Sequence, residues 1–259
     1  MVRASQRRSF LPLMLLGCAT MALMRGGGPA RAEAGRPPAD AAVPFAVGEQ
    51  LEYRVGQNFL TAATAQLRVV DRKPFSGRNA WHFQARAQTV DPVRLLYTLD
   101  DQFDSYTDAA TLAGLQYVTH VRETRRQEDA VVRMSNEGDA ASGDQPSVRV
   151  PAGTRDPLGA LYALRATDWA GTETLTLPVY DGKKLYEMRV RRLERGEEVE
   201  VAAGTYDATR LELRLFERGR ETQGTRFQVW ISEDPRRLPV LIEAELPFGT
   251  FRVELERVR

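Results

Sequence analysis

The sequence predicts a mainly β protein, built as one large curved antiparallel sheet or a half-open β-barrel with one or two short helices. Apolar and polar residues alternate along many segments, for example 51–55, 81–87 and 211–215. A period of two is typical of strands that have one buried and one wet face. Glycines and Asp-Gly turns separate these segments at short intervals, and only two stretches show helical spacing instead.

The first 32 residues have the pattern of an export signal. A basic start precedes an apolar run over residues 10–24, and Ala30-Arg31-Ala32 then offers a small-x-small cleavage pattern. The run is shorter than the roughly 20 apolar residues that a membrane span needs. We therefore expect residues 1–32 to be a signal peptide cut between Ala32 and Glu33, and the mature protein to be periplasmic.

Two features of this segment leave the export route open. Arg7-Arg8 resembles a twin-arginine signal, and the alternative is an ordinary secretion signal that begins with two arginines. Residues 15–18 resemble a bacterial lipobox, which would place a lipid anchor on Cys18. The apolar run continues beyond Cys18, which a lipoprotein signal does not need.

The charge balance excludes two classes of protein. The chain of 259 residues has 36 Lys and Arg against 35 Asp and Glu, and 42% of its residues are hydrophobic. A disordered chain has few apolar residues and a large net charge, and a nucleic-acid-binding protein has a basic excess, so we expect neither. Cys18 is the single cysteine, so a chain cut after Ala32 is stabilised by its core without disulfides.

Beyond the signal, residues 33–44 are rich in Ala and Pro and are predicted to form a flexible leader. No linker-like stretch interrupts the remainder, so we expect a single β-rich domain over 45–259 with about a dozen strands. Asp181-Gly182 predicts a two-residue hairpin turn, because both turn positions need a positive φ. Gly196 is expected at another turn, and residues 136–146 are expected to form the longest loop.

Two segments are predicted to be helical. Residues 91–97 suit a short helix, since Pro92 fits a first helical turn. The stronger prediction is a helix of about ten residues over 156–165, where Asp156 can cap and Pro157 fits the first position. Its spacing is amphipathic, so we expect this helix to lie on or in the mouth of the curved sheet.

The sequence shows no recognisable catalytic or metal-binding constellation. The chain beyond the signal has two histidines, His82 and His120, and both fall on the polar side of alternating segments, which predicts surface or rim positions. The acidic run 100–104 is expected at a solvated strand edge, because it lacks the glycine and final Glu of a calcium loop. We therefore predict a protein that is not an enzyme and that needs no cofactor and no metal ion.

Basic residues gather at 122–126, 183–184 and 189–192, interleaved with acids. We interpret these groups as a solvated face, since edge strands often carry charges. The alternative is a peripheral contact with anionic membrane headgroups.

Large curved sheets either fill their interior or enclose a ligand cavity. The inward-facing residues that we expect to line such a cavity are Tyr53, Trp81, Phe83, Phe227 and Val229. The alternative is that these side chains form an ordinary dry core.

Several motifs resemble those of the exported bacterial family called domain of unknown function 3108. They are GEQLEY at 48–53, PAGTRDPLGALYALR at 151–165, DGKKLY at 181–186, AGTYDA at 203–208 and WISEDPRRLPV at 230–240. The resemblance covers about residues 45–256 and implies an exported protein without an established activity, so it transfers no catalytic residue. The C-terminal pattern also resembles the half-barrel of periplasmic lipoprotein carriers, an analogy of fold that implies an apolar concavity for acyl chains.

These observations favour an exported, non-enzymatic protein that binds a lipid or acyl chain and serves cell-envelope maintenance. One alternative is an interaction module that binds another envelope protein through a sheet edge or through the loop 136–146. The other is an enzyme that acts on envelope polysaccharide through paired carboxylates. We expect no nucleic-acid partner.

Overall fold

The computed structural model describes residues 43–57, 60–135, 139–142, 147–222, 226–246 and 249–259. The predicted signal peptide, Cys18, the Ala32/Glu33 cleavage site and most of the predicted leader lie outside these residues. The described residues contain two helices and fifteen strands, as the sequence predicted for a mainly β protein with short helices. Neither of these helices combines the length and the apolar character that a membrane crossing requires.

The first half of the chain contains β1 to β8, which we call the N-terminal arm. Its strands and first helix are β1 (Gln50–Gln57), β2 (Leu60–Phe75), β3 (Arg78–Thr89), α1 (Val93–Leu96), β4 (Asp100–Asp108), β5 (Gly114–Glu123), β6 (Arg126–Met134), β7 (Asp139–Ser142) and β8 (Val148–Arg149). The helix α2 (Pro157–Ala166) follows. The C-terminal arm then consists of β9 (Thr174–Tyr180), β10 (Leu185–Val201), β11 (Gly204–Glu217), β12 (Arg220–Glu221), β13 (Arg226–Ser232), β14 (Pro239–Leu246) and β15 (Gly249–Val258).

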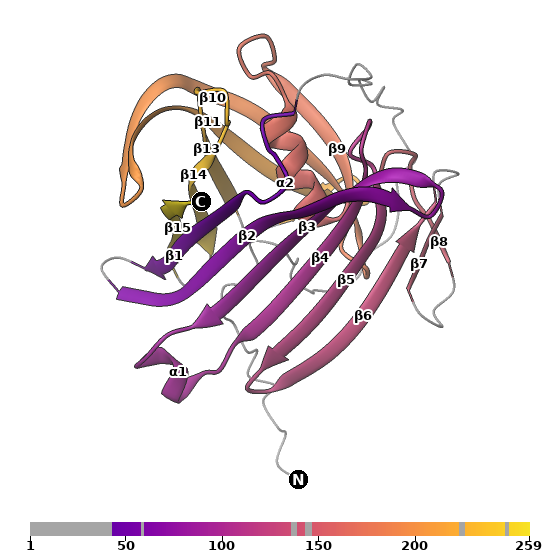
Figure 1. Ribbon diagram of the computed structural model, residues 1–259, viewed down its shortest axis with the longest axis horizontal. Helices are drawn as coiled ribbons and strands as arrows, with labels where there is room; N and C mark the ends of the chain where they lie inside the picture. Colours follow the sequence, from indigo (N-terminus) through magenta and orange to yellow (C-terminus); the bar gives the residue numbers. More distant parts are fainter. Residues whose placement is uncertain (1–42, 58–59, 136–138, 143–146, 223–225, 247–248) are drawn as a thin grey trace.

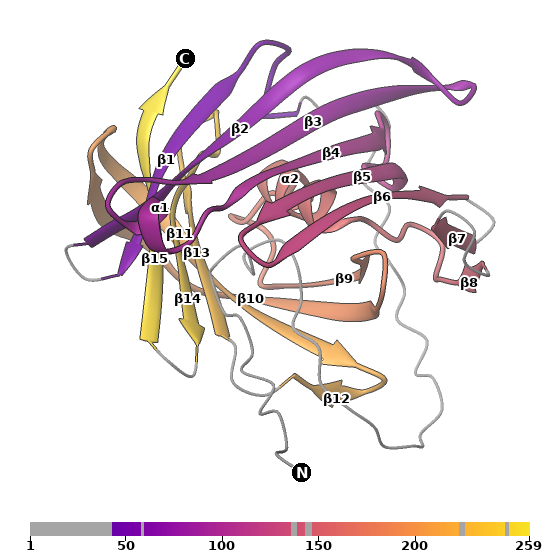
Figure 2. The same cartoon turned by 90° about the horizontal axis from the view of Figure 1, so that it is seen from below.

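All described strands belong to one antiparallel sheet. Its order is β8-β7-β6-β5-β4-β3-β2-β1-β15-β14-β13-β11-β10-β9, and β12 pairs with β11 beside this path. The first and last long strands, β1 and β15, therefore join the two arms at the middle of the sheet. Figures 1 and 2 show both arms curving around α2. The segment between β8 and α2 contacts the other outer strand, β9, where the Arg155 backbone amide donates to the Pro178 carbonyl at 3.0 Å.

The helix over 156–165 forms as predicted, but it is more deeply buried than expected. The Asp156 side chain accepts a hydrogen bond from the Gly159 backbone amide, and Pro157 occupies the first turn. Seven of the ten residues of α2 are buried, so the helix lies inside the curve of the sheet and not at its mouth. A helix that is covered on nearly all sides has no wet face, which corrects the amphipathic interpretation.

Gly159 allows α2 to pack closely against β4. A Cβ atom at this position would lie 2.9 Å from Thr107 Cγ2 and 3.1 Å from Asp156 Oδ2. In an exposed helix, Gly→Ala stabilises by about 1 kcal/mol. Here we expect Gly159→Ala to destabilise the protein by about 1–3 kcal/mol, because the methyl group overpacks the contact with β4. The urea midpoint of unfolding measures this effect.

A second variant tests whether the clash with Thr107 causes this loss of stability. Thr107→Ser removes the γ-methyl group that the new Cβ would meet, so the Gly159→Ala/Thr107→Ser variant should lose less stability relative to Thr107→Ser alone. An unchanged or higher urea midpoint for Gly159→Ala would show that β4 and α2 are not held at this distance.

Three local predictions need correction. The Asp181-Gly182 hairpin has a four-residue turn, because Tyr180 pairs with Leu185 and the Asp181 side chain accepts from the backbone amides of Lys183 and Lys184. Gly196 lies within β10, at a β-bulge and with φ +67°, and not at a turn. The predicted loop 136–146 contains the short strand β7; its remaining residues lie outside the described ones.

The acidic run 100–104 is a fourth correction. It forms the beginning of β4, which pairs with β3 on one side and β5 on the other, so it is not a strand edge. Asp101 and Asp104 are buried. Two flanking strands and their side chains cover the carboxylates, which the local alternation of residues could not indicate.

Candidate ligand cavity

An apolar cavity of about 150 Å³ lies between α2 and the inner face of the sheet. The helix contributes Ala160, Leu161 and Leu164 to its wall, and most of the strands of both arms contribute the rest. A cavity of about this volume in another protein stays dry and binds benzene. The space therefore suits a compact hydrocarbon group or a short stretch of an alkyl chain.

Small side chains create this space. Ala63 and Ala65 on β2 and Ala85 and Ala87 on β3 all line the cavity, and Ala65 pairs directly with Ala87 across the two strands. At these four positions no side chain larger than a methyl group extends from the inner face of the sheet. Opposite them, Leu213, Phe227 and Val229 of the C-terminal arm complete the wall.

Large side chains fill the neighbouring part of the interior. The ring centroids of Phe83 and Tyr162 lie 3.6 Å apart in a stacked arrangement, and Phe45 packs edge-on against Phe83 at 5.3 Å and Trp81 at 5.3 Å. Along β3 the inward positions thus change from Trp81 and Phe83 to alanine. The cavity begins where this change occurs.

The five residues predicted to line a cavity divide into two groups. Tyr53, Phe227 and Val229 line it. Trp81 and Phe83 face the same interior but belong to the aromatic cluster beyond it, where Phe45 and Tyr162 occupy the space in front of them. Sequence reasoning missed the alanines and α2, although the repeated alanines at alternate positions of 63–65 and 85–87 were a readable signal.

A buried ion pair ties α2 to the sheet beside the aromatic cluster. The Arg165 side chain is fully buried and donates to both carboxylate oxygens of Glu49, at 2.6 and 2.9 Å. It also donates to the backbone carbonyls of Arg236 and Arg237. Burial favours a lower pKa for Arg165, but the hydrogen bonds with Glu49 outweigh it and hold the pKa above its ordinary value.

Two inward-facing carboxyl groups are titratable near neutral pH. Burial raises the pKa of Asp156 to about 6, against the effect of hydrogen bonds from the Ser105 hydroxyl and the Gly159 amide. Burial likewise raises the pKa of Asp101 to about 6. Asp156 caps α2 and Asp101 accepts from the Arg122 backbone amide, so both have structural partners.

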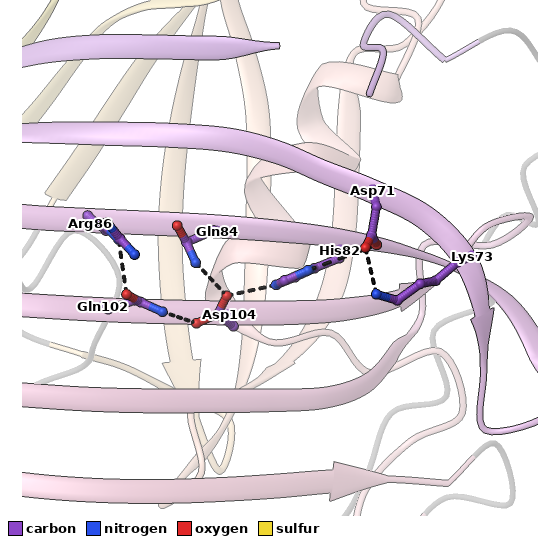
Figure 3. Close-up of polar contacts among 7 residues, drawn as sticks. All are labelled: Asp71, Lys73, His82, Gln84, Arg86, Gln102 and Asp104. Atoms are coloured by element: carbon purple, nitrogen blue, oxygen red, sulfur yellow. Dashed lines mark hydrogen bonds and ion pairs between the residues drawn. The ribbon is translucent and has the colours of Figure 1, made fainter. Parts of the chain in front are cut away.

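The outer face of the sheet carries a polar network on the side opposite α2 (Figure 3). Asp104 accepts from Gln84 at 2.9 Å and from Gln102 at 2.7 Å, and its Oδ1 lies 2.7 Å from His82 Nε2. Burial alone would raise the pKa of Asp104, but these hydrogen bonds outweigh it and lower the pKa. His82 is therefore a mostly covered member of a network, and its ring stacks on Tyr106.

The second predicted surface histidine, His120, pairs with Asp129 on the exposed part of β5 and β6. Within the described residues, no three His, Cys, Asp or Glu side chains are placed to hold a metal ion. The cavity wall itself consists almost entirely of apolar residues. What the site can do chemically is exclude water from a hydrocarbon group.

Comparisons with solved structures agree with this architecture. A β-barrel-like protein of the DUF1849 family of unknown function from Brucella abortus aligns with a TM-score of 0.57 and 11% identity, over 82% of this chain and 97% of its own. At this identity the likeness concerns the fold alone. It supports the predicted curved, barrel-like sheet.

Two further structures align more weakly. The first is a candidate lipoprotein of Parabacteroides distasonis, with a TM-score of 0.39 and 10% identity over 84% of this chain and 97% of its own. The second is a candidate exported protein of Bacteroides fragilis with a YmcC-like fold, with a TM-score of 0.35 and 13% identity over 84% of this chain and 98% of its own. No curated protein matches the sequence significantly.

The family comparison covers most of the domain. Residues 52–256 match the family described as a protein of unknown function, DUF3108. This range extends from β1 to β15 and includes α2 and the cavity. The chain therefore belongs to the DUF3108 family, as its sequence motifs indicated.

Proposed function

We propose that this protein is a non-enzymatic component of the bacterial cell envelope that shelters the hydrocarbon tail of a lipid in the cavity beneath α2. The observation that carries the proposal is the aligned set of alanines on β2 and β3. These small side chains leave an apolar space of about 150 Å³ in the otherwise filled interior of the curved sheet. The export signal that the sequence predicts in residues 1–32 supports a periplasmic location, where acyl chains of envelope lipids are available.

The chemistry of the wall supports a tail and not a headgroup as the buried part of the ligand. Burial of a methylene group contributes about 0.8 kcal/mol, whereas a polar group buried without a hydrogen bond costs about 1–3 kcal/mol. The wall consists mainly of alanine, leucine, valine and phenylalanine side chains, so it offers few hydrogen-bonding partners. The polar exceptions in its lining are Tyr53, Arg86, Thr89, Asp181 and Tyr186. The headgroup of such a ligand would remain outside the cavity.

Filling the cavity should abolish binding. Ala87→Phe places a ring where Ala87 now borders the space, and we expect it to weaken binding of the fluorescent fatty acid cis-parinaric acid by about tenfold or more. A tenfold loss corresponds to about 1.4 kcal/mol, the contribution of roughly two buried methylenes. Fluorescence titration of the purified protein measures the effect, and native mass spectrometry of protein purified from its own host detects a resident lipid.

The matched control is Gln88→Phe, which adds the same ring to the same strand on the opposite, exposed face. It should bind the probe like the unmodified protein. Ala65→Leu provides a smaller filling substitution on β2 if Ala87→Phe lowers the urea midpoint strongly. Repeated recovery of a ligand-free protein that takes up no probe, or equal binding by Ala87→Phe and Gln88→Phe, would count against the proposal.

A further inference from the structure

Exposed leucines gather at one end of the sheet. Among the described residues, the large hydrophobic side chains with the greatest exposure are Leu96 at 87%, Leu95 at 82% and Leu60 at 58%. Leu95 and Leu96 belong to α1, and Leu60 begins β2. Exposed leucines are common singly, but adjacent ones with four-fifths of their surface in water indicate a contact surface.

The three leucines share one location. The Val90 amide donates to the Ala62 carbonyl, so the loop that carries α1 is bonded to the beginning of β2. On its other side, this loop is bonded to the β5–β6 turn, where the Thr98 amide donates to Thr124 Oγ1 and the Thr124 amide donates to the Thr98 carbonyl. Figure 1 shows α1 and the β5–β6 turn at the same end of the sheet. We call this end, from Leu60 through α1 to the β5–β6 turn, the leucine tip.

The leucine tip continues into the cavity wall. Thr89 ends β3 just before α1, Leu99 follows α1, and both line the cavity. Ala63, three residues after Leu60, lines it as well. The same loop thus presents leucines to the outside and bounds the apolar space on the inside.

The charges of the leucine tip largely balance one another, and one arginine is left without an ion pair. Most of its acids face a cation or a tyrosine: Asp100 pairs with Arg94, Asp129 with Arg122, Glu128 with Arg126, and Glu123 interacts with Tyr97. The charge of Asp91 also acts on Arg94. Arg125 is exposed at the β5–β6 turn and forms no ion pair with a described residue. Leucines accompanied by an unpaired arginine suit the surface of a bilayer that contains anionic headgroups.

We propose that the leucine tip docks onto such a bilayer, with Leu95 and Leu96 entering its apolar layer and Arg125 contacting headgroup phosphates. Three leucines on two segments, α1 and the beginning of β2, form protrusions and not a shaped groove, which fits a fluid surface better than a protein partner. The inference rests on the proposed function and deepens it, since docking would bring the cavity wall next to the lipid tails that the cavity is proposed to shelter.

Sedimentation of the purified protein with vesicles tests the inference. Vesicles of phosphatidylcholine alone and vesicles that also contain phosphatidylglycerol are compared. We expect the protein to bind the mixed vesicles, the Leu95→Ser/Leu96→Ser variant to bind them about tenfold or more weakly, and Arg125→Gln to lose mainly the preference for the mixed vesicles. Val148→Ser removes an exposed apolar side chain from β8, away from the leucine tip, and should leave binding unchanged.

The outcomes distinguish this inference from the proposed function. The Leu95→Ser/Leu96→Ser variant should still take up cis-parinaric acid in solution, whereas Ala87→Phe should lose the probe and still bind vesicles. Absence of vesicle binding by the unmodified protein, or binding that is insensitive to the leucines and removed by salt alone, overturns the docking inference and leaves the cavity proposal intact. Leucine-dependent binding of an envelope protein without any vesicle binding overturns it in favour of a protein partner.

Discussion

Arg165→Met is expected to lower the free energy of unfolding by about 3–5 kcal/mol, because it leaves a largely buried carboxylate without its partner. Glu49 receives two hydrogen bonds from Arg165, and its side chain is 12% exposed. The same substitution removes the donors of the Arg236 and Arg237 carbonyls. The urea midpoint of unfolding, at a constant m-value, gives the change in stability.

Two further variants identify the cause of this loss. Arg165→Met/Glu49→Met removes both charges and should be less destabilised than Arg165→Met alone, because replacement of both partners of a buried pair by apolar groups is often close to neutral. Arg54→Met breaks an ion pair of similar length with Glu254 on the exposed face, where the loss should be at most about 1 kcal/mol. Equal losses for Arg165→Met and Arg54→Met would contradict the buried-charge explanation.

Phe83→Ala is expected to cost about 3–5 kcal/mol, the usual range for a fully buried phenylalanine. Phe83 has no exposed surface, stacks on Tyr162 of α2, and contacts Phe45 edge-on. The closely packed rings and the hydrogen-bonded strands around Phe83 have little freedom to move into the space that the missing ring would leave. The substitution also extends the row of alanines on β3, so the cavity should lengthen toward Trp81.

This second consequence can be measured separately from stability. Phe83→Ala should bind a longer or bulkier hydrocarbon probe than the unmodified protein does, in the same fluorescence titration. Phe75→Ala is the control, because Phe75 also stacks on a ring, that of Tyr106, but is only partly buried; its loss should be about 1–2 kcal/mol with unchanged probe binding. A similar loss for both variants, or no change in probe size for Phe83→Ala, would contradict the expected role.

Local patterns predicted much of the fold. The period-two alternation of 51–55, 81–87 and 211–215 predicted strands with the correct inward faces, because in a strand successive side chains point to opposite sides. Asp156 and Pro157 predicted the start of α2, because a cap and a first turn depend only on neighbouring residues. The motifs at 151–165 and 230–240 identified the family.

The cavity and the long-range contacts around it could not be predicted from local patterns. Ala65 and Ala87 line the same space because β2 and β3 pair in one register, and a shift by one residue would turn either alanine outward. Arg165 forms its ion pair with Glu49, which lies 116 positions earlier in the chain. Asp101 and Asp104 are buried because β4 lies between two other strands.

The sequence by itself therefore determined the class of fold, the beginning of α2 and the family, since each depends on residues that are close together in the chain. Only the tertiary structure decided which inward side chains fill the interior and which leave it open, that α2 lies inside the sheet, and that three leucines share one tip. These features depend on strand order and register, which bring together residues that no short-range pattern relates.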